Sequence, residues 1–157
     1  MKVALIHYHL QPGGVTRVIE NTILAWEKGG SGPEACVVLS GRPYPGKVLR
    51  HVRTVEGLDY ADAQKAIDPA ILTERLKEAA RTALGGLPDL WHIHNHSLGK
   101  NPALSSAVAL LAQSGARLLL QPHDYAEDGR PENFCNLAGT QPTIYPCLLY
   151  TSPSPRD

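Results

Sequence analysis

The fold is indicated first by the stretch VALIHYHLQPGG at residues 3–14. Its first four residues are all apolar, which is typical of a parallel strand buried on both faces. A Gln-Pro-Gly-Gly turn ends this run. Apolar residues then recur at spacings of three and four from Val15 to Trp26, which predicts an amphipathic helix ending near Gly29 and Gly30. A strand, a glycine loop and a helix in this order predict the start of a βαβ unit.

The same alternation continues along the chain. Short apolar runs predict further strands at residues 36–39, 90–94 and 117–120, with a weak strand within 48–55. Two more helices are predicted to begin where a capping side chain precedes a proline, at Asp68-Pro69 and Asn101-Pro102, and to stop at 85–86 and 115. Right-handed crossovers would place the helices on both faces. The sequence therefore predicts an α/β fold, a Rossmann-like doubly wound domain with a mostly parallel sheet.

Composition and charge argue against several classes of protein. The chain has 157 residues, with 15 Lys and Arg against 15 Asp and Glu, so its charge does not favour nucleic acid as a partner. The apolar runs are far shorter than the roughly 20 residues of a transmembrane helix, and His7 and His9 interrupt the first run too early for a signal peptide. Three cysteines without C-x-x-C spacing argue against a disulfide framework or a cysteine-built zinc site. We expect a cytoplasmic protein with at most peripheral membrane contact.

The end of the chain differs from the rest. Beyond about residue 141 the helical and strand periodicities stop, and four of the last sixteen residues are prolines. Residues 147–157, CLLYTSPSPRD, resemble the in-frame translation of a transposon-end adapter used in sequencing libraries; a native Ser/Pro-rich tail is the alternative. We therefore expect residues 1–146 to be an incomplete domain from a longer protein and residues 147–157 to be a non-native tail.

Polar segments follow three of the predicted strands, at residues 7–14, 92–100 and 123–130. Together they contain six of the seven histidines. In open α/β sheets, ligands bind beyond the carboxyl ends of the strands. This shared edge is therefore the predicted site.

The glycine pair Gly13 and Gly14 lies between the first strand and its helix. Without a Cβ, these residues let a ligand approach the backbone closely, and the unpaired N–H groups of the helix start suit a phosphate. The third glycine of a full G-x-G-x-x-G motif is absent, and a tight turn without a ligand is the alternative. Arg17, one turn into the helix, would either contact the phosphate or face solvent.

The histidines of the second polar segment alternate, so His92, His94 and His96 would share one face of an extended strand. Because parallel strands are usually buried on both faces, we expect His92 in the core. His94 and His96, nearer the strand end, are expected to reach the site.

His123 and Asp124 follow the last predicted strand. A histidine there can donate to a sugar hydroxyl, and a neighbouring carboxylate can accept from hydroxyls or tune the imidazole. With His94 and His96 they would also suit a metal-dependent hydrolase, the first alternative function. A non-catalytic nucleotide- or sugar-binding module is the second.

Residues 1–26, the HNH at 94–96 and the QPHDY at 121–125 resemble family-four glycosyltransferases of the GT-B fold. The resemblance covers roughly residues 1–136, the N-terminal domain alone. It implies transfer of a sugar from a nucleotide-diphosphate sugar to a sugar, lipid or other acceptor, with retention and with no metal or cofactor. The active site would lie between this domain and a missing C-terminal domain of the same chain. Without that domain, which carries the family's paired glutamates, the fragment is expected to be inactive.

The resemblance matches Gly13 and Gly14 to the family's glycine loop and His123 to its cleft histidine. The assigned site consists of a catalytic pair, His123 and Asp124, a donor-phosphate set, Gly13, Gly14 and Arg17, and acceptor or supporting residues, His94, Asn95 and His96.

Overall fold

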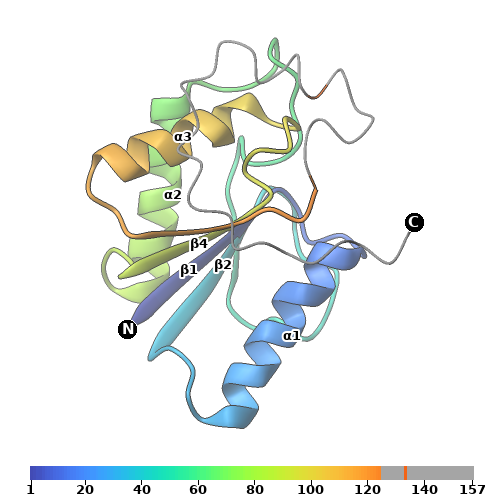
Figure 1. Cartoon of the computed structure of the whole chain (residues 1–157), viewed down its shortest axis with the longest axis vertical. Coiled ribbons are helices and arrows are strands. Elements are labelled where there is room, and N and C mark those ends of the chain that lie inside the picture. Colours follow the sequence, from blue (N-terminus) through green and yellow to red (C-terminus); the bar gives the residue numbers. More distant parts are fainter. Residues whose placement is uncertain (125–132, 134–157) are drawn as a thin grey trace.

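The computed structural model describes residues 1–124 and residue 133. Among these residues, five parallel strands form one sheet in the order β3-β2-β1-β4-β5. The strands are β1 (Lys2–His7), β2 (Ala35–Ser40), β3 (Val52–Thr54), β4 (Leu90–His94) and β5 (Leu118–Gln121). The helices are α1 (Gly14–Gly29), α2 (Pro69–Leu84) and α3 (Pro102–Gln113). Helix α1 covers one face of the sheet and α2 and α3 cover the other (Figure 1), which confirms the predicted Rossmann-like doubly wound fold.

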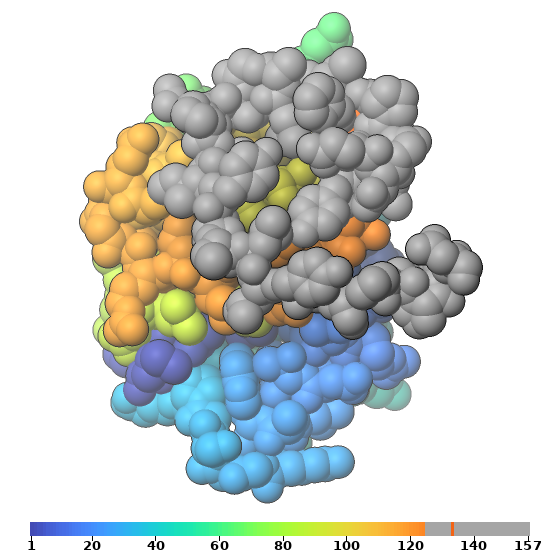
Figure 2. Space-filling model, viewed as in Figure 1, coloured from blue at the N-terminus to red at the C-terminus, as the bar shows by residue number. Residues whose placement is uncertain are grey.

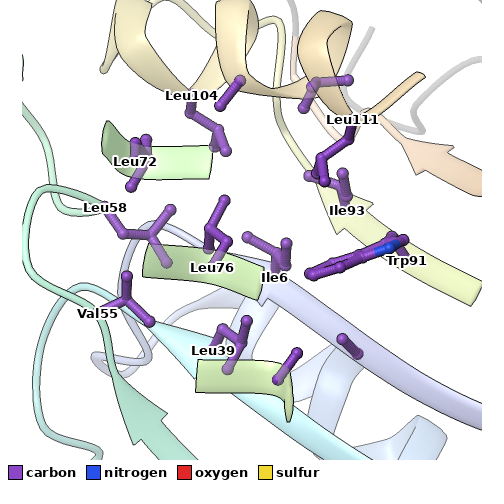
Figure 3. Packing of buried hydrophobic residues seen from close by; sticks show 14 of the residues in the cluster. Ile6, Leu39, Val55, Leu58, Leu72, Leu76, Trp91, Ile93, Leu104 and Leu111 are labelled. Carbon is purple, nitrogen blue, oxygen red and sulfur yellow. The ribbon is translucent and has the colours of Figure 1, made fainter. Parts of the chain in front are cut away.

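Alternating side chains of the central strand fill two separate cores. Ala4 and Ile6 of β1 belong to the larger core, beneath α2 and α3, whereas Val3 and Leu5 belong to the smaller core, beneath α1. Figure 3 shows Ile6 of the larger core among the side chains that pack beneath the two helices. On the surface, α1 and the start of β2 lie on one side and α3 with β5 on the other (Figure 2). A strand buried on both faces explains the unbroken apolar run in the sequence.

The three helices start in two different ways. Asp68 accepts a hydrogen bond from the Ala70 N–H at 2.7 Å, and Asn101 accepts one from the Ala103 N–H at 3.0 Å. In both helices a proline occupies the first turn, as predicted from the two Asx-Pro pairs. Helix α1 instead follows Gly13, and no side chain of the described residues caps it.

Some predicted boundaries need correction. The weak strand expected within residues 48–55 is the three-residue β3, and β5 lies one residue later than predicted. The predicted tail at 147–157 lies outside the described residues. Within the described part of the chain, no helix is long and apolar enough to cross a membrane.

The register of the strands brings their polar ends together. Ile6 of β1 pairs with Ile93 of β4, and His94 of β4 pairs with Gln121 of β5. The chain leaves β1 toward β2 on one side, while β4 lies on the other. The boundary between β1 and β4 is therefore the topological switch point, where ligands bind in sheets of this type.

Candidate functional site

Two buried imidazoles face each other across the switch point. The ring centroids of His7, at the end of β1, and His94, at the end of β4, are 6.4 Å apart. Burial lowers the pKa of His7 to about 4, and it lowers the pKa of His94 further. Both rings are therefore neutral at pH 7. His7 Nδ1 and His94 Nε2 are buried and have no hydrogen-bond partner among the described residues.

A direct contact joins the end of β4 to the segment after β5. His94 Nδ1 lies 2.9 Å from His123 Nε2, and the two rings are nearly parallel, with an interplanar angle of 10° and centroids 5.2 Å apart. Burial lowers the pKa of the half-buried His123, although Asp124 opposes this shift. The structure thus brings together two of the predicted site residues as a pair of neutral imidazoles.

Asn95 connects the remaining parts of this edge. Its Oδ1 accepts the backbone N–H groups of His123, at 2.5 Å, and Asp124, at 3.2 Å, while its Nδ2 donates to Asp124 Oδ2 at 3.2 Å. Its carbonyl accepts from the Tyr8 hydroxyl at 2.9 Å. Its φ of 55° lies in the left-handed region, where asparagine is one of the few tolerated side chains. Asn95 therefore fixes the positions of His123 and Asp124 after β5.

The predicted alternation of histidines holds for His92 and His94 and fails at His96. The ring centroids of His92 and His94 lie 4.3 Å apart, and His92 Nε2 contacts Gln121 Oε1 at 2.8 Å. Because β4 ends at His94 and Asn95 turns the backbone, His96 lies beyond the strand. Its ring is buried, both ring nitrogens lack a partner among the described residues, and burial lowers its pKa to about 4.

The glycine pair opens α1 after the loop that leaves β1. Neither residue has a positive φ; the φ of Gly13 is 174°, which is extended backbone. A Cβ at Gly14 would meet nothing within 4 Å, and a Cβ at Gly13 would meet the Gln11 carbonyl oxygen at an ordinary 3.8 Å. Neither backbone strain nor packing against the described chain requires glycine at these two positions.

Arg17 is exposed and paired within its own helix. Its side chain is 74% exposed, and its Nη1 pairs with Glu20 Oε2 at 3.0 Å. The largely buried Glu20 carboxylate also accepts from the Tyr44 hydroxyl at 2.5 Å. These three residues, with Gly13, line a cavity of about 140 Å³ at the start of α1. The positive charge of Arg17 therefore offsets the negative charge of Glu20, which would otherwise repel an anion at the start of α1.

The geometry does not favour a metal centre. In the part of the chain that the structure describes, no group of three or more histidine, cysteine or carboxylate side chains could hold a metal ion. His94 and His123 each direct one ring nitrogen at the other, which leaves fewer lone pairs for a shared ion. The hydrolase alternative built on His94, His96, His123 and Asp124 is therefore not supported.

Three residues of this edge were not assigned a role from the sequence. His7 is one of the clustered histidines, Gln121 is part of the QPHDY motif, and Tyr8, directly after β1, has no sequence signal of its own. Their position at the carboxyl ends of parallel strands is the feature that identifies them.

Comparison with known proteins gives one informative similarity. The chain is 27% identical over 142 residues to a mannosylglucosyl-3-phosphoglycerate synthase from Petrotoga mobilis (strain DSM 10674 / SJ95). The aligned region covers 83% of this chain and 27% of that protein, so the chain spans about a quarter of the relative's length. No protein-family model matches the chain, and no solved structure matches it.

Proposed function

We propose that residues 1–146 form the acceptor-side, N-terminal domain of a retaining glycosyltransferase of the GT-B fold. The observation that carries the proposal is the joined set His94, Asn95, His123 and Asp124 at the switch point of a Rossmann-like sheet. The similarity to a synthase whose name specifies a mannosylglucosyl product supports the same reaction class. The donor is a nucleotide-diphosphate sugar, and the acceptor is a sugar, a lipid or another hydroxyl compound.

The glycine loop stabilises the leaving group in this proposal. As the glycosidic bond breaks, negative charge grows on the departing nucleoside diphosphate. Helix α1 begins after the carboxyl end of β1 with no side-chain cap among the described residues, and Gly14 has no Cβ in the way of a phosphate oxygen. Each preorganised donor of this kind contributes about 3 kcal/mol to transition-state stabilisation.

His123 and Asp124 orient the transferred sugar. A neutral imidazole can donate one hydrogen bond to a sugar oxygen, and a carboxylate accepts from sugar hydroxyls. Asn95 holds the backbone of both residues, so their geometry is set before the substrate arrives. Preorganisation of this kind lowers the entropic part of the barrier.

The rest of the active site belongs to a C-terminal domain of the same chain. That domain supplies most contacts to the nucleotide, and the transferred sugar lies between the two domains. The proposal requires no metal or other cofactor and places the enzyme in the cytoplasm, with the membrane surface as a contact only for a lipid acceptor.

The test is the full-length enzyme, obtained by recovering the uninterrupted reading frame. We expect it to contain a second α/β domain and to release a nucleoside diphosphate from a nucleotide sugar in the presence of an acceptor. Nuclear magnetic resonance of the product should show the anomeric configuration of the donor. Inversion would contradict retention, and the lack of transfer from any nucleotide sugar would contradict the whole proposal.

The residue-level test is His123→Ala in that enzyme. We expect turnover to fall about 100-fold or more, because a preorganised donor next to the reacting sugar is lost. The matched control is His51→Ala, an exposed histidine before β3, which should leave turnover unchanged. Near-normal turnover in His123→Ala would indicate that His123 has only a structural role.

A further inference from the structure

We infer that His94 is a positioning residue that holds His123 as its Nδ1–H tautomer, so that His123 offers the substrate a hydrogen-bond donor rather than a base. The identity of that substrate rests on the proposed glycosyltransferase function. The tautomer itself follows from the geometry of the two rings and can be tested without any activity.

The contact between the rings permits only two arrangements. A hydrogen bond between His94 Nδ1 and His123 Nε2, 2.9 Å apart, needs a proton on one nitrogen and a lone pair on the other. In the first arrangement His94 donates through Nδ1, and a neutral His123 carries its own proton on Nδ1. In the second arrangement His123 donates through Nε2, and a neutral His94 carries its proton on Nε2.

Burial of the far nitrogen of His94 favours the first arrangement. The residue is 0% exposed, and its Nε2 has no hydrogen-bond partner among the described residues. The second arrangement would leave a buried N–H without an acceptor, which is rarer in folded proteins than a buried acceptor without a donor. The first arrangement leaves only a bare lone pair at that position.

If His94 were doubly protonated, it would donate from both nitrogens and the two arrangements would no longer be distinct. The surroundings of His94, however, disfavour a positive charge on its ring. Burial, together with the neighbouring His92, His123 and His7 rings, holds the pKa of His94 far below neutrality. Burial also lowers the pKa of His123, so each ring in the pair carries a single proton at pH 7.

The neighbouring contacts hold the surroundings of the pair in place. Gln121 Oε1 can only accept, so His92 donates to it through Nε2. The amide oxygen of Asn95 holds the backbone N–H of His123 at 2.5 Å, which fixes the main chain that carries the ring. In the first arrangement, His123 directs its Nε2 lone pair at His94 Nδ1 and carries its own proton on Nδ1.

The consequence concerns the chemistry available at this position. With Nδ1 protonated and Nε2 occupied by His94, His123 has no lone pair with which to remove a proton from an acceptor hydroxyl. It can donate to an oxygen of the substrate, either a sugar hydroxyl or a phosphate oxygen. His123 is then an orienting donor, and the acceptor must lose its proton to another group.

The experiment is a long-range proton–nitrogen correlation spectrum of the histidine rings in the ¹⁵N-labelled 157-residue chain at pH 7. We expect the Nδ1 atoms of His94 and His123 to show the chemical shift of a protonated nitrogen and their Nε2 atoms that of a bare one. His92 should show the reverse pattern. A protonated Nε2 on His123 would overturn the inference.

Two variants separate positioning from packing. His94→Asn keeps an amide N–H near the place of Nδ1 and should retain the Nδ1–H form of His123. His94→Leu removes the donor, and the two His123 nitrogens should then move toward averaged shifts. His51→Gln is the control and should change neither signal. An unchanged His123 in His94→Leu would contradict the inference, and the wild-type spectrum decides the question even where a variant does not fold.

The outcomes also separate this inference from the proposed function. If the expected tautomers are found but the full-length enzyme transfers no sugar, the glycosyltransferase proposal fails and the positioning role stands. If transfer is found together with an Nε2–H His123, the positioning role fails alone. In an active enzyme, His94→Leu should lower kcat about tenfold, the effect of one hydrogen bond, and His94→Asn should restore most of it.

Discussion

Helix α1 and the pair α2 and α3 pack on opposite faces of the same sheet (Figure 1), and they also begin differently. Asp68 and Asn101 occupy the N-cap positions of α2 and α3, and each accepts a backbone N–H of its helix. Helix α1 begins at Gly14 with Gly13 at the N-cap and no capping side chain.

The difference is not forced by the fold. Gly13 has an extended φ, and a Cβ at either glycine would make no close contact with the described residues. An aspartate or asparagine could therefore occupy the N-cap of α1, as Asp68 and Asn101 do in the other two helices. The chain satisfies the free N–H groups of a helix where the helix is structural. Among the described residues, it provides no side-chain cap where we propose that a diphosphate binds. The contrast suggests three experiments.

The largest effect on stability is expected for Asn101→Ala. The Asn101 side chain is fully buried, and besides capping α3 it donates to the Gly57 and Asp59 carbonyls at 2.8 and 2.6 Å. Its loss should lower the free energy of unfolding by about 3 kcal/mol, because a cap and two carbonyl partners are lost together. Urea denaturation of the chain measures this change.

The matched control for that variant is Asp68→Ala. Asp68 caps α2 at an exposed position, so its loss should cost about 1 kcal/mol. Equal losses in the two variants would mean that the contacts of Asn101 to the preceding loop contribute nothing beyond the cap.

A smaller effect, on binding rather than on folding, is expected for Gly14→Val in the full-length enzyme. The side chain has space in the free protein but would occupy the approach of the donor phosphate. We expect KM for the nucleotide sugar to rise about tenfold, the equivalent of one hydrogen bond, with little change in the unfolding midpoint. Steady-state kinetics measures the first quantity and thermal unfolding the second.

Gly86→Val serves as the control for the glycine loop. A Cβ at Gly86 would approach only Lys2 Nζ, at 3.9 Å, and the residue lies between α2 and β4. This variant should leave KM for the donor unchanged. If Gly14→Val behaves in the same way, the glycine pair is a turn and not a phosphate site.

The smallest effect is expected for Gly13→Asp, which gives α1 the cap that the other helices have. The free energy of unfolding should rise by a few tenths of a kcal/mol, the usual difference between glycine and aspartate at an N-cap. At the same time KM for the donor should increase, because the new carboxylate takes up the N–H groups and repels the diphosphate. A gain in stability without a change in KM would argue against anion binding at this helix.

The elements of the fold could be predicted because their signals are local. Apolar runs marked the central strands, and the Asp68-Pro69 and Asn101-Pro102 pairs gave the starts of α2 and α3. The extent of β3 could not be predicted, because three residues at the edge of a sheet depend on their pairing with β2 rather than on their own pattern.

The site could be predicted as a set of residues but not as a set of contacts. His94 and His123 are 29 positions apart, and their contact depends on the register of β4 against β5, which no local pattern specifies. The alternation at His96 failed because the left-handed backbone of Asn95 ends the strand. The pairing of Arg17 with Glu20, by contrast, could have been predicted from the sequence, because residues three positions apart are neighbours on a helix.

The backbone and the side chain of Asn95 place two independent constraints on which residue can occupy this position. Its left-handed φ excludes β-branched and most bulky residues, and its amide both accepts from two N–H groups and donates to a carboxylate. Glycine meets the first demand without the second, and aspartate lacks the donor. Among related sequences, we therefore expect Asn95 to be more conserved than the histidines around it. An asparagine at this position would then help to identify distant homologues of the domain.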